Sequence, residues 1–194
     1  MLKIFGDSRS GNCLKVKWVA DHLGRAYEWI EIDVLEGQSR TPDHLAMNPA
    51  GQVPAVILDD GRPLAQSNAI MIHLAEGGPL IPADPYDRAR MFEWLFWEQY
   101  SHEPYIAVAR YRVKLLGADV STLEARLVQR GWAALQRIED GLTGRDFLVG
   151  DRVSLADVAL IAYTRLSHEG GFGRDAYPRV QAWIARVEAA IGIG

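Results

Sequence analysis

Hydrophobic positions change their spacing along the chain, and this change divides it into a first part with strands and a second part without them. Residues 2–5, Leu-Lys-Ile-Phe, form a short segment typical of a strand, and residues 30–34 alternate apolar with acidic side chains, so both segments are predicted strands. Between them, small and apolar side chains recur at helical spacing over residues 13–23, and the helix is expected to end at Gly24. A strand, a helix and a strand in this order imply parallel pairing of the two strands.

The following segment predicts a short helix, a hairpin and a third helix. Thr41-Pro42 is typical of a helix start, and this helix is expected to reach Met47. Residues 55–58 form an apolar strand, Asp60-Gly61 supplies the hairpin turn, and the chain returns over residues 63–65 before a helix opens. The resulting order β-α-β-α-β-β-α is a thioredoxin-like layout.

After a segment rich in glycine and proline, the pattern is helical only. Residues 78–85 are predicted to link a first domain, residues 1–77, to a second, residues 86–194. The stretch up to Leu116 is expected to bend at Pro104, because an interior proline removes a hydrogen bond and clashes with the preceding turn. The predicted fold class is α+β, with a thioredoxin-like domain followed by an all-α bundle.

Two capping boxes predict the starts of later helices. Ser121-Thr-Leu-Glu124 is expected to begin a helix that runs to about Leu142, and Ser154-Leu-Ala-Asp157 to begin an apolar, deeply buried one. In each box a serine hydroxyl and an acidic side chain satisfy backbone N–H groups that the first helical turn leaves without partners. The last helix is expected from about Pro178 to Ala190.

Composition indicates a soluble, cytoplasmic globular protein. The 194 residues are 48% hydrophobic, which suffices for a substantial core, and a net charge of −4 argues against nucleic acid as a partner. No apolar stretch approaches the length of a membrane span. The single cysteine, Cys13, excludes an intrachain disulfide and fits a reducing compartment, and the histidines form no ligand-spaced pair that would indicate a metal site.

Two short motifs are suited to holding a peptide-like ligand. Val53 precedes Pro54, which favours extended backbone at Val53 and makes this the place where a cis bond is expected. An extended ligand can then pair with the Val53 N–H and C=O groups, as an added strand does. Gln66-Ser67 opens a helix, and a helix N-terminus with a serine hydroxyl is an anion site.

These motifs, in this layout, resemble the glutathione-binding domain of the glutathione transferase superfamily. Residues 147–157 are similar to the capping-box motif of its helical domain, so the resemblance covers essentially the whole chain. It implies that Val53, before a cis Pro54, pairs with the cysteinyl backbone of glutathione, and that Gln66-Ser67 holds the γ-glutamyl carboxylate.

The resemblance also implies a second carboxylate site. Family members hold the glycyl carboxylate with residues before the second helix and before the Val-Pro pair, which are Arg40 and Gln52 here. Arg40 is equally a solvated charge at a helix entry, and both interpretations stay open. Asn48 is interpreted as a turn former.

For the glutathione sulfur, the resemblance points to the loop after the first strand. Ser10 matches the catalytic serine of theta- and zeta-like enzymes, and the Ser-Gly-Asn pattern resembles bacterial nu-like members, in which the asparagine, here Asn12, also faces the sulfur. A hydrogen bond to the thiolate lowers the thiol pKa and raises the population of nucleophile. Cys13 is interpreted as a buried small hydrophobe, and Ser8 is a weaker alternative.

The function that the resemblance implies is that of a glutathione transferase, with glutathione as co-substrate and a small electrophilic or disulfide substrate. The acceptor stays open, as does the balance of conjugation against disulfide-reductase or peroxidase activity. A zeta-like isomerase is a weaker alternative, because Gly11-Asn12 follows Ser10 where that class has an adjacent serine. A non-catalytic module, as in stringent starvation protein A or elongation factor gamma subunits, is the alternative of a different class.

The long helical stretch carries two further expectations. Members of the family pair two subunits, so a homodimer is expected, with the third helix and this long stretch at its interface. The stretch has apolar residues on more than one face, which a partner subunit would cover. The residues considered are Met91, Trp94, Leu95, Trp97 and Glu98. The stretch is also expected to wall the acceptor pocket. Its aromatic side chains are equally candidates for the core; they are Trp97, Tyr100, Tyr105 and Tyr111, with Phe172 from a later loop.

Overall fold

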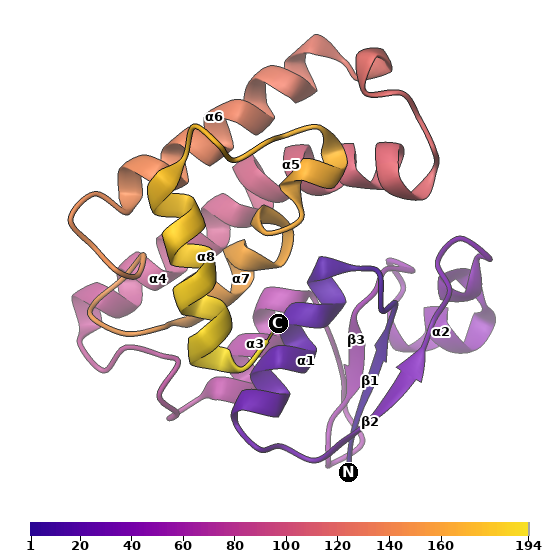
Figure 1. The fold of residues 1–194 in the computed structure, drawn as a ribbon. Coiled ribbons are helices and arrows are strands. Elements are labelled where there is room, and N and C mark those ends of the chain that lie inside the picture. Colours follow the sequence, from indigo (N-terminus) through magenta and orange to yellow (C-terminus); the bar gives the residue numbers. More distant parts are fainter. Residues whose placement is uncertain (194) are drawn as a thin grey trace. The chain divides into compact units, whose positions relative to one another are not determined.

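The computed structural model describes residues 1–193, which divide into a first compact unit, Met1–Pro79, and a second that begins at Leu80. The division falls inside the glycine- and proline-rich segment 78–85. Strands occur in the first unit, whereas the elements described in the second are helical (Figure 1). The predicted α+β class, a thioredoxin-like domain followed by an all-α domain, is confirmed.

A four-stranded sheet in the order β2-β1-β3-β4 forms the centre of the first unit. The strands are β1 (Leu2–Gly6), β2 (Tyr27–Glu31), β3 (Ala55–Ile57) and β4 (Pro63–Ala65). The parallel pairing of β1 with β2 is confirmed, and β3 pairs antiparallel with both β1 and β4. The second strand was predicted too late in the sequence, because the N–H groups of Asp33 and Val34 bond to the side chains of Gln38 and Asp7 and not to a neighbouring strand.

Three α-helices complete the first unit: α1 (Gly11–His22), α2 (Pro42–Met47) and α3 (Ser67–Ala75). Helices α1 and α3 pack against each other on one side of the sheet (Figure 1). Thr41 caps α2 by accepting a hydrogen bond from the His44 N–H at 3.4 Å, as the Thr41-Pro42 signal predicts. The predicted element order is therefore confirmed.

The long helical stretch of the second unit is irregular just before Pro104. Helix α4 (Pro85–Trp97) passes into a π-helical turn (Glu98–His102), and α5 (Glu103–Arg110) follows. The predicted disturbance is confirmed but occupies a whole widened turn, because proline has no N–H to donate and its ring clashes with a carbonyl one turn earlier. A second π-helical turn, Tyr111–Leu115, ends the stretch.

The predicted capping box at Ser121 is wrong. Helix α6 (Ala125–Gly141) begins later, with Glu124 at its N-cap and no side-chain cap. Ser121 lies in a short 3-10 turn, Val120–Thr122, where its N–H bonds to the Asp119 carboxylate at 2.8 Å. Asp119 therefore caps this short turn, and no side chain caps α6.

The capping box at Ser154 is confirmed. Ser154 and Asp157 cap each other at the start of α7 (Leu155–Thr164), and every residue of this helix is buried. The Asp157 carboxylate also accepts hydrogen bonds from the Leu148 N–H and from Trp183 Nε1, both at 2.9 Å. Trp183 lies on α8 (Pro178–Ile191), the predicted last helix. The Asp157 side chain therefore joins α7 and α8 to the loop before α7.

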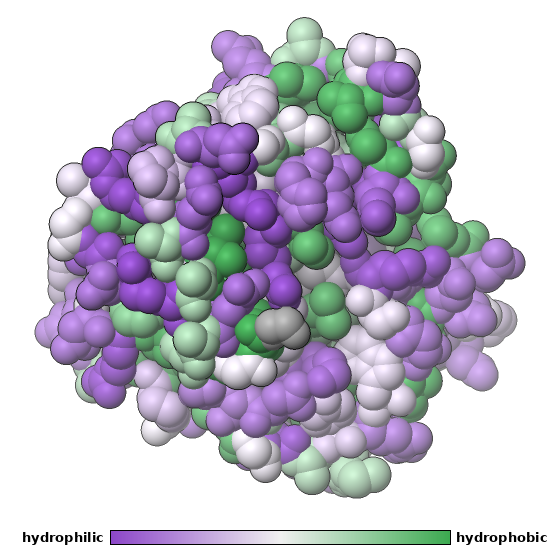
Figure 2. All heavy atoms as spheres, viewed as in Figure 1, coloured by the Kyte–Doolittle hydropathy of each residue, from purple (hydrophilic) through white to green (hydrophobic). Residues whose placement is uncertain are grey.

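The described surface is mixed in polarity. Hydrophilic side chains cover most of the face drawn in Figure 2, and hydrophobic ones gather toward its upper right. Among residues 1–193, no helix has both the length and the apolar character needed to cross a membrane.

Candidate functional site

Val53 lies in the loop before β3, and its peptide bond to Pro54 is cis, as expected. The residue is half-buried, and no hydrogen bond joins its backbone to another of the described residues 1–193. Backbone groups removed from water normally have partners. An extended ligand could supply both of them here, which is how a peptide adds to an exposed strand edge.

Two buried side chains hold the peptide group in front of Val53. His44 Nε2 and Asn48 Nδ2 contact the Gln52 carbonyl oxygen at 3.0 and 2.9 Å. Asn48 Oδ1 also accepts a hydrogen bond from the Ala50 N–H at 3.2 Å, in agreement with its interpretation as a turn former. Sequence reasoning misses His44, although its position one helical turn before Asn48 is a signal for a shared role.

Arg40 is tied to the same loop. Its Nη1 donates to the Ala50 carbonyl at 3.1 Å, and the guanidinium covers Gly51 so closely that a Cβ there would lie 2.5 Å from Nη1. Gly51 has φ +61°, a conformation that glycine adopts without strain. The side chains of Arg40 and Gln52 are exposed, so both stand where a ligand along Val53 would meet them.

Helix α3 begins at a residue with unusual backbone geometry. Gln66 has φ +70°, the only positive φ of a non-glycine residue among residues 1–193. Such conformations cost on the order of 1–3 kcal/mol and cluster at ligand sites. The side chain of Gln66 makes no cap hydrogen bond, and the partial positive charge of a helix N-terminus attracts an anion.

A hydrogen bond connects this helix start to that of α1. Ser67 is buried, and its Oγ donates to Asn12 Oδ1 at 3.3 Å across a separation of 55 positions. The residues predicted for the γ-glutamyl carboxylate and for the sulfur are therefore neighbours. Periodicity and local motifs do not show this contact, because it depends on the packing of α1 against α3.

Ser10 is the N-cap residue of α1, but its side chain makes no cap hydrogen bond to the helix backbone. Nearby Cys13 is fully buried, and burial raises the pKa of its thiol to about 12, although hydrogen bonds from Ser10 and from the Asp7 N–H act to lower it. A thiol that stays protonated is a poor nucleophile. The interpretation of Cys13 as a buried hydrophobe is confirmed, and Ser8 is exposed on the loop before it.

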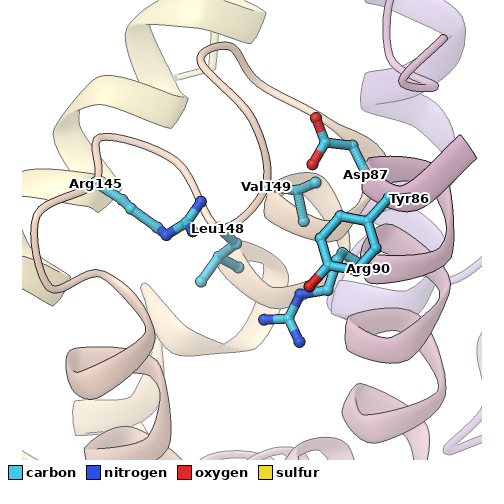
Figure 3. Close-up of a pocket in the computed structure, with 6 residues that line it drawn as sticks. All are labelled: Tyr86, Asp87, Arg90, Arg145, Leu148 and Val149. Atoms are coloured by element: carbon cyan, nitrogen blue, oxygen red, sulfur yellow. The ribbon is translucent and has the colours of Figure 1, made fainter. Parts of the chain in front are cut away.

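The aromatic residues considered for an acceptor pocket divide between core and surface. Phe172 is 1% exposed and packs edge-on against Trp132 with ring centroids 5.2 Å apart. It therefore belongs to the core and does not line an acceptor pocket. Tyr100 is 83% exposed. A pocket of about 220 Å³ in the second unit is lined by other residues, with Arg90 and Arg145 facing it from α4 and from the loop before α7 (Figure 3).

The arrangement suits a peptide-like ligand that carries a carboxylate and a thiol. An extended backbone edge, a helix start without a side-chain cap and the polar side chains of Ser10 and Asn12 lie in one unit. Among the described residues, no group of three or more His, Cys, Asp or Glu side chains is arranged to hold a metal ion.

Comparison with known protein families gives matches to both parts of the chain. Residues 2–76 match "Glutathione S-transferase, N-terminal domain" and residues 114–190 match "Glutathione S-transferase, C-terminal domain". Glutathione S-transferase theta-1 of Mus musculus is 32% identical over 206 residues, which cover 99% of this chain and 84% of the relative. Maleylacetoacetate isomerase of Rhizobium meliloti (strain 1021) is 33% identical over 161 residues, covering 79% and 75%.

Solved structures give the same result. The glutathione S-transferase of Pseudomonas fluorescens Pf-5 superposes with a TM-score of 0.93 at 45% identity, covering 97% of this chain and 94% of that one. Ure2p in complex with glutathione superposes with a TM-score of 0.87 at 25% identity, covering 98% and 90%. Both of its domains match the family models, and its relatives and similar structures include glutathione transferases. The chain therefore belongs to the glutathione transferase superfamily.

Proposed function

We propose that this protein is a glutathione transferase that binds glutathione in its first unit and activates the thiol. Ser10 and Asn12 donate hydrogen bonds to the sulfur, which stabilises the thiolate and releases the thiol proton to solvent near neutral pH. The observation that supports this most strongly is the Ser67–Asn12 contact, because it joins the start of α3 to the start of α1.

The remaining contacts position the tripeptide. Val53, before Pro54, pairs with the cysteinyl backbone, and Gln66 and Ser67 receive the γ-glutamyl carboxylate at the start of α3. Arg40 and Gln52 face the glycyl carboxylate in this proposal, and their exposed side chains on the Val53 loop support it; His44 and Asn48 hold that loop.

The reaction proposed is attack of the thiolate on a small electrophile. A carbon–sulfur bond forms, and the leaving group departs with the electrons of the bond that breaks. The acceptor substrate decides whether the reaction is conjugation or the reduction of a disulfide or peroxide, and an assay with each type of acceptor distinguishes them. We place the protein in the cytoplasm, where a thiol co-substrate stays reduced.

The test is retention on immobilised glutathione followed by a conjugation assay with an aryl halide. Retention together with conjugation supports the transferase, whereas retention without turnover toward electrophiles, disulfides or peroxides favours a binding module. The observation that supports this second candidate is the likeness to Ure2p, which has been solved in complex with glutathione and also as a nitrogen regulation fragment. The isomerase of Rhizobium meliloti keeps a third, to be tested with a cis-configured diketo acid.

Ser67→Ala is expected to weaken glutathione binding roughly ten- to a hundredfold, because in the complex the Ser67 hydroxyl turns from Asn12 to the γ-glutamyl carboxylate, and a charge-assisted hydrogen bond is worth about 1.5–3 kcal/mol. Titration calorimetry measures the affinity. Ser167→Ala is the matched control, since it also removes a buried serine hydroxyl, here one that bonds to the Phe172 carbonyl in the second unit. Equal affinities of the wild type and Ser67→Ala would remove this serine from the site.

We further propose a homodimer whose interface is formed by other residues than those that the sequence indicated. Met91, Trp94 and Leu95 are at most 1% exposed, so they need no partner. Phe96 and Tyr100 are 73% and 83% exposed on α4 and the turn after it, and Phe96 stacks on Phe92 with centroids 6.3 Å apart. An aromatic stripe of this kind is better covered by a symmetric partner than by water.

Sedimentation at micromolar concentration is expected to give twice the chain mass. Phe96→Glu should shift the mass toward the monomer, because it places a charge on the stripe. Leu116→Glu is the control, since Leu116 is 57% exposed on another segment. A monomer mass for the wild type, or an unchanged dimer in Phe96→Glu, contradicts the proposal.

A further inference from the structure

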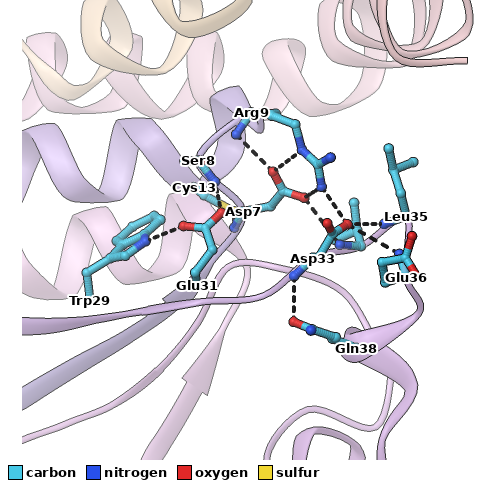
Figure 4. Close-up of polar contacts among 11 residues, drawn as sticks. Asp7, Ser8, Arg9, Cys13, Trp29, Glu31, Asp33, Leu35, Glu36 and Gln38 are labelled. Atoms are coloured by element: carbon cyan, nitrogen blue, oxygen red, sulfur yellow. Dashed lines mark hydrogen bonds and ion pairs between the residues drawn. The ribbon is translucent and has the colours of Figure 1, made fainter.

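The loop that leads to Ser10 is held by a buried carboxylate, that of Asp7, which binds Arg9. Asp7 is 1% exposed at the end of β1 and accepts hydrogen bonds from the Arg9 N–H and Nε, each at 2.9 Å, and from Arg9 Nη2 at 2.6 Å (Figure 4). The Val34 N–H, in the loop after β2, adds a bond at 3.2 Å. One carboxylate therefore joins the loop before Ser10 to the loop that follows β2.

A second carboxylate grips the same arginine from the loop after β2. Asp33 Oδ1 contacts Arg9 Nη2 at 2.7 Å and also accepts hydrogen bonds from the N–H groups of Leu35 and Glu36. Figure 4 shows the guanidinium between the two carboxylates. We call Asp7, Arg9 and Asp33 the loop clamp.

The clamp is connected to Ser10 through the backbone. The Ser10 N–H donates to the Asp7 carbonyl at 2.9 Å, and the Ser10 carbonyl accepts from the N–H groups of Cys13 and Leu14. The backbone of Ser10, from which the hydroxyl projects, is thus held by the loop on one side and by the first turn of α1 on the other.

A second Arg–Asp pair in the same unit shows what is special about the clamp. Arg62 contacts Asp60 with the same three groups, its N–H at 3.1 Å, Nε at 2.8 Å and Nη2 at 2.6 Å. The Asp60 side chain, however, is 51% exposed, against 1% for Asp7. An exposed ion pair contributes little to stability, whereas a buried carboxylate is strongly destabilising when its partner is removed, so the buried pair keeps its geometry.

We propose that the loop clamp is a positioning device that holds the Ser10 hydroxyl at the glutathione sulfur and so sets how strongly the site stabilises the thiolate. This inference rests on the proposed function. Arg9 and Asp33 themselves need touch neither glutathione nor acceptor.

The charges of the clamp fit this role. Burial acts to raise the pKa of Asp7, but the hydrogen bonds from Arg9 and Val34 outweigh it and hold that pKa below its usual value. The hydrogen bond from Arg9 also lowers the pKa of Asp33. Both carboxylates are charged at neutral pH, so the clamp is closed whenever the enzyme works.

The test measures the thiol pKa of bound glutathione by ultraviolet absorbance, together with kcat and KM across pH. Arg9→Gln is expected to raise the thiol pKa by about one unit and to lower kcat on the order of tenfold below that pKa, with recovery at high pH. Glutathione affinity should stay within about a factor of three, because the Val53 and Ser67 contacts remain. Arg9→Lys should restore the effect only in part, since lysine lacks the fork that spans two carboxylates.

Asp33→Asn keeps the test decisive if Arg9→Gln fails to fold. The asparagine oxygen still accepts from Leu35 and Glu36, while the charge facing Arg9 is lost, so a smaller shift in the same direction is expected. Arg62→Gln is the matched control and should change neither pKa nor kcat. If Ser10→Ala raises the thiol pKa but Arg9→Gln and Asp33→Asn do not, the clamp proposal is overturned alone; if the wild type does not bind glutathione, the proposed function itself fails.

Discussion

Asp157→Ala is expected to lower the free energy of unfolding of the second unit by roughly 3–5 kcal/mol. The buried carboxylate accepts hydrogen bonds from the N–H groups of Leu148 and Ser154 and from Trp183 Nε1, each at 2.9 Å. Alanine leaves all three donors buried without a partner and removes the cap of α7. Urea denaturation followed by tryptophan fluorescence measures the loss.

Asp119→Ala provides the contrast. Asp119 also accepts a backbone N–H at the start of a helical turn, but it is exposed, so water replaces the lost bond and the loss of stability should be far smaller than in Asp157→Ala. Equal losses in the two variants would show that burial does not decide the strength of these caps.

Ser10→Ala is expected to lower turnover on the order of a hundredfold, the effect of removing one hydrogen-bond donor from a developing or fixed anion. Glutathione affinity should change by only a small factor, because the Val53 edge and the start of α3 remain. A donor that stabilises the thiolate acts on reactivity more than on ground-state binding. The measurement is kcat together with the pH profile of the bound thiol, whose pKa should rise.

Asn12→Ala decides between the two donors. Its side chain also accepts the hydrogen bond from Ser67, so this variant should weaken glutathione binding as well as turnover. If the thiol pKa rises in Asn12→Ala but not in Ser10→Ala, the roles assigned to the two residues are reversed.

The sequence by itself determined those features that a few consecutive residues can specify. Thr41-Pro42 started α2, Val53-Pro54 adopted a cis bond, and the turn at Asp60-Gly61 paired β3 with β4. The element order and the fold class followed from hydrophobic spacing, because the period of a strand or a helix is a local property.

The two capping boxes show where local pattern stopped being sufficient. Ser154 caps α7 and Ser121 caps no helix, although both satisfy the same pattern. At Ser154, the carboxylate of Asp157 also receives donors from α8 and from the preceding loop; at Ser121, nearby Asp119 competes for the N–H. A local hydrogen bond is weak enough that such tertiary partners choose between alternatives.

Only the tertiary structure decided which distant residues meet at the site. Ser67 contacts Asn12, Arg9 lies between Asp7 and Asp33, and the backbone of Val53 is left without a partner among the described residues. These relations depend on how α1 packs on α3 and where β2 ends, which no single segment encodes. Hydrogen bonds and ion pairs act over a few ångströms in space, and folding alone sets that distance for residues far apart in the chain.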